Sequence, residues 1–157
     1  MDSGNYLARI DSLCTRDLAG EHSGSDVFMA GSGYCIVSLE VSHELRTEDA
    51  SRRVRTEAEL HALKEDISLM LNARWGEQHP LWWMGTIVVR IDRGEVIAEP
   101  WATVSTLVDE LHLWQPEGKG RWIAIGVADR DVDDEVHLLA VVTETDPPWG
   151  PAVTACR

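Results

Sequence analysis

Two almost continuously apolar segments constrain the fold of this chain more than any other feature. They span residues 122–127 and 136–142, and each has the length of a single strand. Runs of this kind are typical of strands that are buried on both faces, and such strands lie in the middle of a sheet. We therefore expect both segments to be central strands, covered by helices on one side.

The N-terminal part of the chain also predicts strands. Apolar and polar side chains alternate over residues 5–15, which is the period of a half-buried strand. Residues 26–41 contain two apolar stretches that are interrupted at Gly31-Ser32-Gly33, and glycines at such a break favour a turn or a bulge. These segments predict a hairpin or a meander.

Apolar residues at helical spacing predict two helices. The first covers residues 57–74 and follows a capping box formed by Thr56 and Glu59, whose side chains would satisfy backbone N–H groups at the helix start. The second covers residues 103–114 and carries a similar apolar stripe. Helices of this kind must bury that stripe, so both are expected to pack on the sheet.

A hairpin is expected between the two helices. Residues 86–91 and 96–99 are its strands, and Gly94 lies in the connecting turn. The predicted order along the chain is therefore ββ-αββ-αββ, in one α+β domain over residues 1–146. Its single, mostly antiparallel sheet has the two helices on one face, and residues 147–157 form a proline-rich tail.

The charge of the chain restricts its partners. Acidic residues outnumber basic ones 27 to 14, and the formal net charge is −13. Such a field repels nucleic acid and anionic membranes and attracts basic proteins. No apolar run approaches the ~18 residues of a membrane span, and the N-terminus lacks the features of a signal peptide. We expect a cytoplasmic protein with a basic protein partner and no nucleic-acid or membrane partner.

The sequence predicts no cofactor, no metal site and no catalytic residue. The three cysteines, Cys14, Cys35 and Cys156, are widely spaced and form no CxxC pair, which argues against thiolate zinc sites. The histidines are scattered, and the chain contains no HExxH, GxSxG or phosphate-binding glycine loop. These absences favour a protein that is not an enzyme.

One tryptophan-rich segment is the densest group of candidate binding residues. The chain has seven tryptophans against one phenylalanine and two tyrosines. Adjacent residues of a strand point to opposite faces, so at least one of two neighbouring indoles faces solvent, a partner or a second layer, and an exposed indole is a typical binding hot spot. Alternatively, the indoles pack on the helices and the histidine is a turn residue. The candidate residues are Trp75, Glu77, His79, Trp82 and Trp83.

An acidic loop forms a second candidate site. Aspartates at 129, 131 and 133 match the first three ligand positions of an EF-hand loop, but Asp134 replaces the required glycine and Ala140 replaces the bidentate glutamate. A solvated connector, a looser calcium site and a negative patch for a basic protein are the alternatives. The candidate residues of this loop are Asp129, Asp131, Asp133, Asp134 and Glu135.

These features favour an acidic binding protein that captures a basic protein through tryptophan anchors. In size, acidity and absence of catalytic motifs, the chain resembles toxin-neutralising immunity proteins, although it shares no motif with them. The first alternative is a small enzyme or ligand-binding protein with a tryptophan-lined pocket, in which His79 or Glu77 moves protons. The second is a calcium-dependent module that uses residues 129–135.

Overall fold

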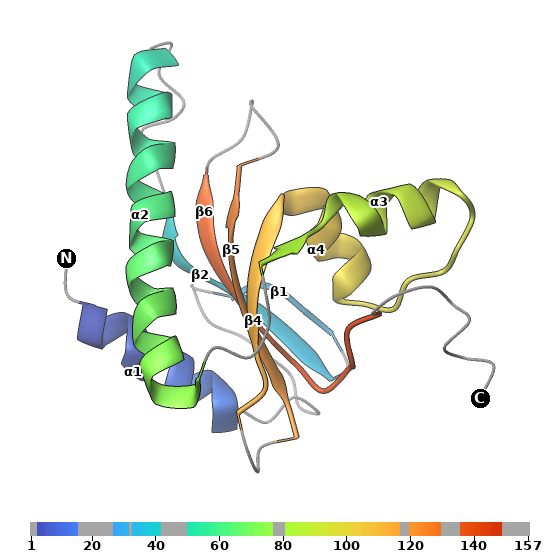
Figure 1. Ribbon diagram of the computed structural model, residues 1–157, viewed down its shortest axis with the longest axis horizontal. Helices are drawn as coiled ribbons and strands as arrows, with labels where there is room; N and C mark the ends of the chain where they lie inside the picture. Colours follow the sequence, from blue (N-terminus) through green and yellow to red (C-terminus); the bar gives the residue numbers. More distant parts are fainter. Residues whose placement is uncertain are drawn as a thin grey trace.

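A six-stranded antiparallel sheet forms the middle layer of the molecule (Figure 1). The computed structural model describes residues 3–15, 27–31, 33–41, 50–76, 81–116, 120–129 and 136–148. The strands are β1 (Val27–Gly31), β2 (Tyr34–Val41), β3 (Trp82–Trp83), β4 (Glu110–Trp114), β5 (Trp122–Ala128) and β6 (His137–Thr143). They lie in the order β1-β2-β6-β5-β4-β3, and every neighbouring pair is antiparallel. The predicted α+β class with one antiparallel sheet is therefore confirmed.

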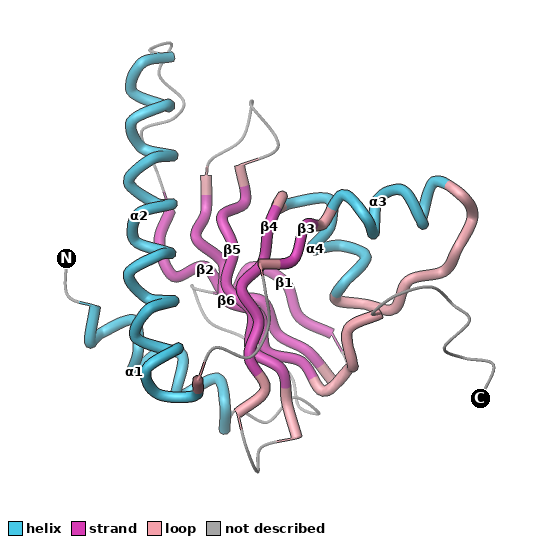
Figure 2. Tube along the Cα trace, viewed as in Figure 1, coloured by secondary structure: helices cyan, strands magenta, loops and turns pink. Residues whose placement is uncertain are grey.

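Helices cover both faces of the sheet. In Figures 1 and 2, α1 (Ser3–Thr15) and α2 (Ala50–Trp75) lie on one side, while α3 (Gly85–Asp92) and α4 (Trp101–Leu107) lie on the other. One face carries α1 and α2, and a second pair covers the face that was expected to be free of helices. The two helices expected to share a face correspond to α2 and, in part, α4, and these lie on opposite faces of the sheet. The order along the chain is α-ββ-α-β-αα-βββ, which differs from the predicted ββ-αββ-αββ.

The two apolar segments are central strands, as the sequence predicts. β6 pairs with β2 and β5, and β5 pairs with β6 and β4. All seven residues of β5 are buried, because its alternate side chains enter two different cores. Ile123 and Ile125 face α1 and α2, while Ala124 and Ala128 face α3 and α4. Helices on both faces explain why these strands are apolar at nearly every position.

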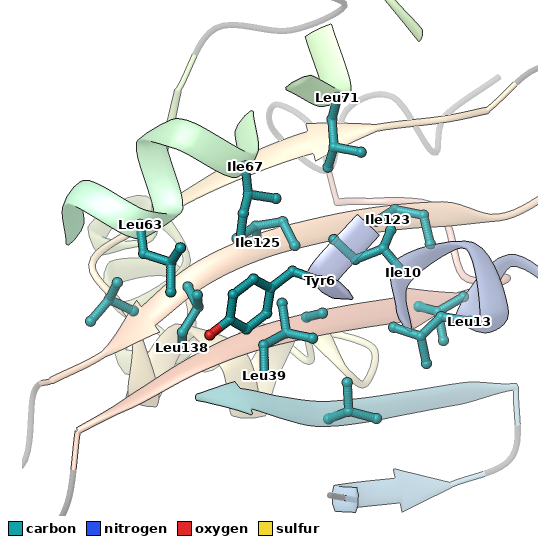
Figure 3. Close-up of a cluster of buried hydrophobic side chains, with 14 of the residues drawn as sticks. Tyr6, Ile10, Leu13, Leu39, Leu63, Ile67, Leu71, Ile123, Ile125 and Leu138 are labelled. Carbon is teal, nitrogen blue, oxygen red and sulfur yellow. The ribbon is translucent and has the colours of Figure 1, made fainter. Parts of the chain in front are cut away.

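The core on the α1–α2 side joins the ends of the chain to its middle (Figure 3). The labelled side chains of this cluster point into one space and come from α1, α2, β2, β5 and β6. They are Tyr6, Ile10, Leu13, Leu39, Leu63, Ile67, Leu71, Ile123, Ile125 and Leu138. Alternate residues of β2, β5 and β6 belong to this core and to the second one. Both layers of helices therefore pack on the same strands.

Residues 5–15 form a helix, so the strand prediction is wrong there. The buried side chains of α1 are Tyr6, Ile10, Leu13 and Cys14, which recur every three or four residues. That spacing places them on one helical face. The short alternation of apolar and polar residues fits a strand equally well at Tyr6 and Ile10. In a strand, Leu13 would point to the opposite face from Tyr6 and Ile10. The helix is favoured because it buries all three side chains against the sheet.

Residues 86–99 do not form the expected hairpin. α3 covers the first predicted strand, and residues 95–98 have no regular structure. Ile87 is buried in the second core, and Ile91, one helical turn later, packs against it. Packing thus overrides the strand preference of β-branched residues. Gly94 still makes the turn, with φ of 92° that suits glycine.

The segment predicted as a helix over residues 103–114 is divided between two elements. α4 ends at Leu107, Val108 is extended, and β4 then begins at Glu110. From this point the side chains alternate, because Leu111 and Leu113 enter the second core while Trp114 enters the first. The helical spacing of the apolar residues cannot reveal this change of period.

The helix predicted over residues 57–74 is present but longer. α2 begins at Ala50, so Thr56 lies within the helix and does not form its N-cap. The helix ends at Trp75, and Gly76 follows with φ of 83°, as the sequence predicts. The hairpin of residues 26–41 is also confirmed, since β1 and β2 pair around Gly33.

The C-terminal segment is described only in part. Residues 144–148 follow β6 without regular structure, and the indole N–H groups of Trp101 and Trp122 donate to Thr145 O and Asp146 Oδ1. Most of the predicted tail lies outside the described residues, so its boundary stays a prediction. Among the described residues, no helix is long and apolar enough to span a membrane.

Candidate functional site

The three indoles of the tryptophan-rich segment have different environments. Trp75 is half-buried at the end of α2, with its ring centroid 6.3 Å from that of Trp114. Trp82 is also half-buried and packs on Trp101 at 5.5 Å. Trp83 is 60% exposed and lies on the opposite face of β3 from its neighbour. One indole of the segment is therefore open to a partner.

Local backbone contacts hold Trp83 in place. β3 is an edge strand, and Trp83 pairs there with Glu110 of β4. Its ring lies so close to the backbone of Gly85 that a side chain at position 85 would collide with it. The Thr86 hydroxyl donates to Trp83 O at 3.0 Å. An exposed indole held in this way loses little conformational freedom when it binds.

A pocket of about 230 Å³ opens beside β3, between α2 and β4. α2 packs mainly on β5 and β6, and β4 and β3 continue the sheet beyond β5. The gap between the helix and these outer strands forms the pocket. Its lining residues come from α2, β4 and the residue before β3, and they are Glu65, Ser68, Leu69, Asn72, Leu81, His112, Leu113 and Trp114.

Two buried polar atoms of this lining lack a partner. Ser68 is 2% exposed, and neither its Oγ atom nor Nε2 of His112 has a hydrogen-bond partner among the described residues. Nε2 of His112 lies 3.4 Å from Oε2 of Glu65, close enough for electrostatic attraction. A buried polar atom left unpaired costs about 1–3 kcal/mol. A ligand that paired with these atoms would remove that cost.

Burial and local charge keep the His112 ring neutral. Burial lowers the pKa of His112 from its usual 6.5, and the charge of Lys64 lowers it further, while Glu65 and Glu110 act in the opposite direction. The ring stacks on Trp114 with centroids 6.0 Å apart. The imidazole therefore offers one nitrogen as an acceptor at neutral pH.

The pocket has a well-ordered wall. The indole N–H of Trp114 donates to Asn72 Oδ1 at 2.8 Å, which links β4 to α2 across the base of the pocket. Trp114 itself is almost fully buried. This hydrogen bond joins two residues of the pocket lining.

Exposed apolar side chains surround the pocket mouth. Leu69 is 67% exposed and Leu81 is 42% exposed, and both line the pocket. Trp83 follows on the same face of the sheet as Leu81. We call Leu69, Leu81 and Trp83, together with the pocket lining, the β3–β4 corner. Contiguous apolar groups with a polar centre are typical of a binding surface.

The candidate residues of the acidic loop are described only at its start. Oδ2 of Asp129 lies 2.8 Å from Nε2 of His61, so this carboxylate connects the end of β5 to α2. Asp131, Asp133, Asp134 and Glu135 lie outside the described residues, as do Glu77 and His79. Within the described ranges, no group of three or more His, Cys, Asp or Glu side chains could hold a metal ion. The calcium hypothesis therefore stays a prediction.

Sequence reasoning did not identify the pocket residues. Ser68 follows the buried Ile67 in α2, and a hydroxyl within an apolar helix face is a weak signal by itself. His112 and Trp114 share a sheet face only because residues 110–114 form a strand, and that segment was expected to be helical. Because a helix was predicted there, the sequence did not indicate that His112 and Trp114 lie side by side in the pocket lining.

Comparison with known proteins gives no relative from which a role could be transferred. No family model matches the chain, and no curated protein or solved structure is significantly similar to it. The geometry of the β3–β4 corner is therefore the basis on which a function can be assigned.

Proposed function

We propose that this chain is a non-catalytic binding protein that captures a basic protein partner at the β3–β4 corner. An inhibitor or immunity protein is the most specific form of this proposal. The observation that carries it is the exposed indole of Trp83, which local contacts hold on an edge strand. A large, rigid and accessible indole of this kind is a typical centre of a protein interface.

The chemistry around Trp83 supports a basic partner. Leu69 and Leu81 add exposed apolar surface, and the exposed carboxylates of Glu65 and Glu110 adjoin it. The net charge of −13 would attract a basic protein over a distance before the apolar groups make contact. In this proposal, charge raises the association rate and the buried indole slows dissociation.

A second candidate function is the binding of a small organic ligand. Its support is the pocket itself, which is lined by Trp114 and in which the buried polar atoms of Ser68 and His112 have no hydrogen-bond partner among the described residues. This candidate differs from the expected tryptophan-lined site, because neither Trp75 nor Trp82 lines the pocket. The roles expected for Glu77 and His79 stay predictions.

Site-specific photo-crosslinking tests the proposed function in cells of the source organism. A photoreactive phenylalanine analogue replaces Trp83 in one variant, Leu69 in a second and Val96 in a control. Val96 is 96% exposed but belongs to the segment between α3 and α4, and these helices lie on the opposite side of the sheet from α2 (Figure 1). We expect one basic protein to be crosslinked at positions 83 and 69 and not at 96. The same adducts at all three positions would refute a specific interface at the corner.

A further inference from the structure

The pocket of the β3–β4 corner gathers hydrogen-bond acceptors around a small, partly apolar space. We propose that it receives the guanidinium group of an arginine side chain of the partner, an inference that rests on the proposed function. Glu65 and Ser68 would accept hydrogen bonds from this group, and the His112 ring would lie beside it. Leu69 and Leu81, which line the mouth, would contact its aliphatic stem.

The volume of the pocket suits a single side chain. Pockets for drug-sized molecules and cofactors enclose about 300–1,000 Å³, whereas this one encloses about 230 Å³. The rings of His112 and Trp114 line the pocket, with His112 the more exposed of the two, and a planar guanidinium group packs well on aromatic rings. A side chain that projects from a docked partner would therefore fill the space that a larger ligand could not enter.

The polar groups match a donor rather than an acceptor. A guanidinium group carries five N–H donors and no acceptor. The Glu65 carboxylate has acceptors only, the Ser68 hydroxyl oxygen can accept, and the neutral His112 ring keeps one acceptor nitrogen. An anionic ligand would instead meet the Glu65 carboxylate, which lies 3.4 Å from Nε2 of His112.

The charges that surround His112 favour a cation. Glu65 on α2 and Glu110 on β4 are negative, and Lys64 on α2 is positive. The net charge of these three groups around the ring is therefore negative. The low pKa of His112, caused first by burial and then by Lys64, prevents the ring from adding a second positive charge that would oppose an incoming guanidinium group.

The hydroxyl of Ser68 also indicates that the pocket binds a ligand. Its Oγ atom is buried at the pocket wall without a partner among the described residues, although burial of this kind destabilises the free protein. Groups that lower stability are typical of functional sites, where binding removes the cost. Ser105 provides a matched comparison, because it is equally buried but its hydroxyl donates to Ala102 O at 2.7 Å.

An NMR titration of the full chain with N-acetyl-arginine methylamide tests the pocket chemistry. We expect saturable shifts at the Trp114 indole N–H and the His112 ring. The neutral citrulline analogue should bind about tenfold more weakly, the loss expected when a hydrogen bond to a charged group is weakened. Glu65→Gln and Ser68→Ala should weaken binding of the arginine probe to a similar extent. Ser105→Ala should leave it unchanged, since Ser105 belongs to the opposite core layer.

Three results would overturn the proposal: equal affinity for the citrulline analogue, tighter binding of acetate or phosphate, or no saturable shift at the Trp114 indole. The arginine probe should also reduce crosslinking at position 83 in a dose-dependent manner. A probe that binds the pocket without reducing that crosslink would refute occupation by the partner's arginine. The crosslink itself would still support the proposed function, so the two proposals can fail separately.

Discussion

At the scale of single residues, two buried serines in similar secondary structure differ in the hydrogen bonding of their hydroxyl groups. Ser68 in α2 and Ser105 in α4 are both buried, but among the described residues only Ser105 has a hydrogen-bond partner for its hydroxyl. A buried polar group stabilises a protein only when it is paired. The Ser105 hydroxyl is satisfied within its own helix, whereas the Ser68 hydroxyl is available to a ligand.

Replacement of each serine by alanine should therefore change stability in opposite directions. We expect Ser68→Ala to raise the free energy of unfolding by about 1 kcal/mol, because it removes an unpaired buried hydroxyl. Ser105→Ala should lower it by about 0.5–1.5 kcal/mol through the lost hydrogen bond. Urea denaturation measures both values, and destabilisation by Ser68→Ala would indicate that its hydroxyl is paired in solution.

The His112 ring should make stability depend on pH in a mildly acidic range. Its pKa is lowered in the folded protein, so the unfolded chain binds its proton more readily, with a pKa of about 6.5. The stability that the neutral ring contributes is complete above pH 6.5 and is lost as the pH falls through the lower folded pKa. His112→Gln should remove this part of the acid-induced loss, as measured by denaturation between pH 5 and pH 8.

His61→Gln is the control for the pH experiment. His61 lies on α2 beside Asp129, outside the pocket lining. The variant should keep the decrease in stability that His112 causes. If His112→Gln and the unmodified protein lose stability in parallel, the folded pKa of His112 is not lowered in solution.

At the scale of elements, α1 is attached to the sheet by polar contacts in addition to the packing of its apolar face. The Tyr6 hydroxyl donates to Glu40 Oε2 at 2.7 Å. The Arg9 guanidinium donates to the backbone oxygens of Leu39 and Ser38 at 2.8 and 2.9 Å. These contacts exist only where a helix crosses β2, which is why the period of residues 5–15 alone did not identify the element.

Tyr6→Phe should weaken the attachment of α1. We expect a loss of about 1.5–3 kcal/mol, the range for a hydrogen bond to a charged group. Burial and the Glu40 carboxylate raise the pKa of Tyr6 from 10.0 to about 12. Stability linked to the neutral phenol is thus complete below pH 10 and is lost as the pH rises through 12. The phenylalanine variant should not show this alkaline loss in denaturation experiments.

At the scale of the whole molecule, the sheet extends beyond α2. α1 and α2 cover the inner strands of one face, while β4 and the short β3 continue past them. The β3–β4 corner lies at this uncovered margin. An edge strand with exposed apolar residues is a surface that proteins usually protect, so its exposure here supports a role in binding.

The association rate with the partner should depend strongly on salt. A net charge of −13 attracts a basic protein at long range, and salt screens this attraction over a Debye length of about 8 Å at 0.15 M ionic strength. We expect the rate constant to fall at least about tenfold between low and high salt, with a smaller change in the dissociation rate. Stopped-flow measurements at several ionic strengths test this, and a rate unaffected by salt would remove electrostatic attraction from the mechanism.

The sequence by itself determined those elements whose local pattern fits one kind of structure only. β5 and β6 are apolar at nearly every position, β1 and β2 meet at a glycine turn, and α2 stops before Gly76. The adjacent indoles of Trp82 and Trp83 also had to separate, because neighbouring residues of a strand point to opposite faces.

Tertiary structure alone decided the rest. Whether residues 5–15 and 86–91 became helices, and where α4 gave way to β4, depended on packing against strands far away in the chain, since short apolar segments fit either period. The pocket has the same origin. Ser68 and His112 are 44 positions apart, and each is an ordinary polar residue until the fold places both beside one pocket.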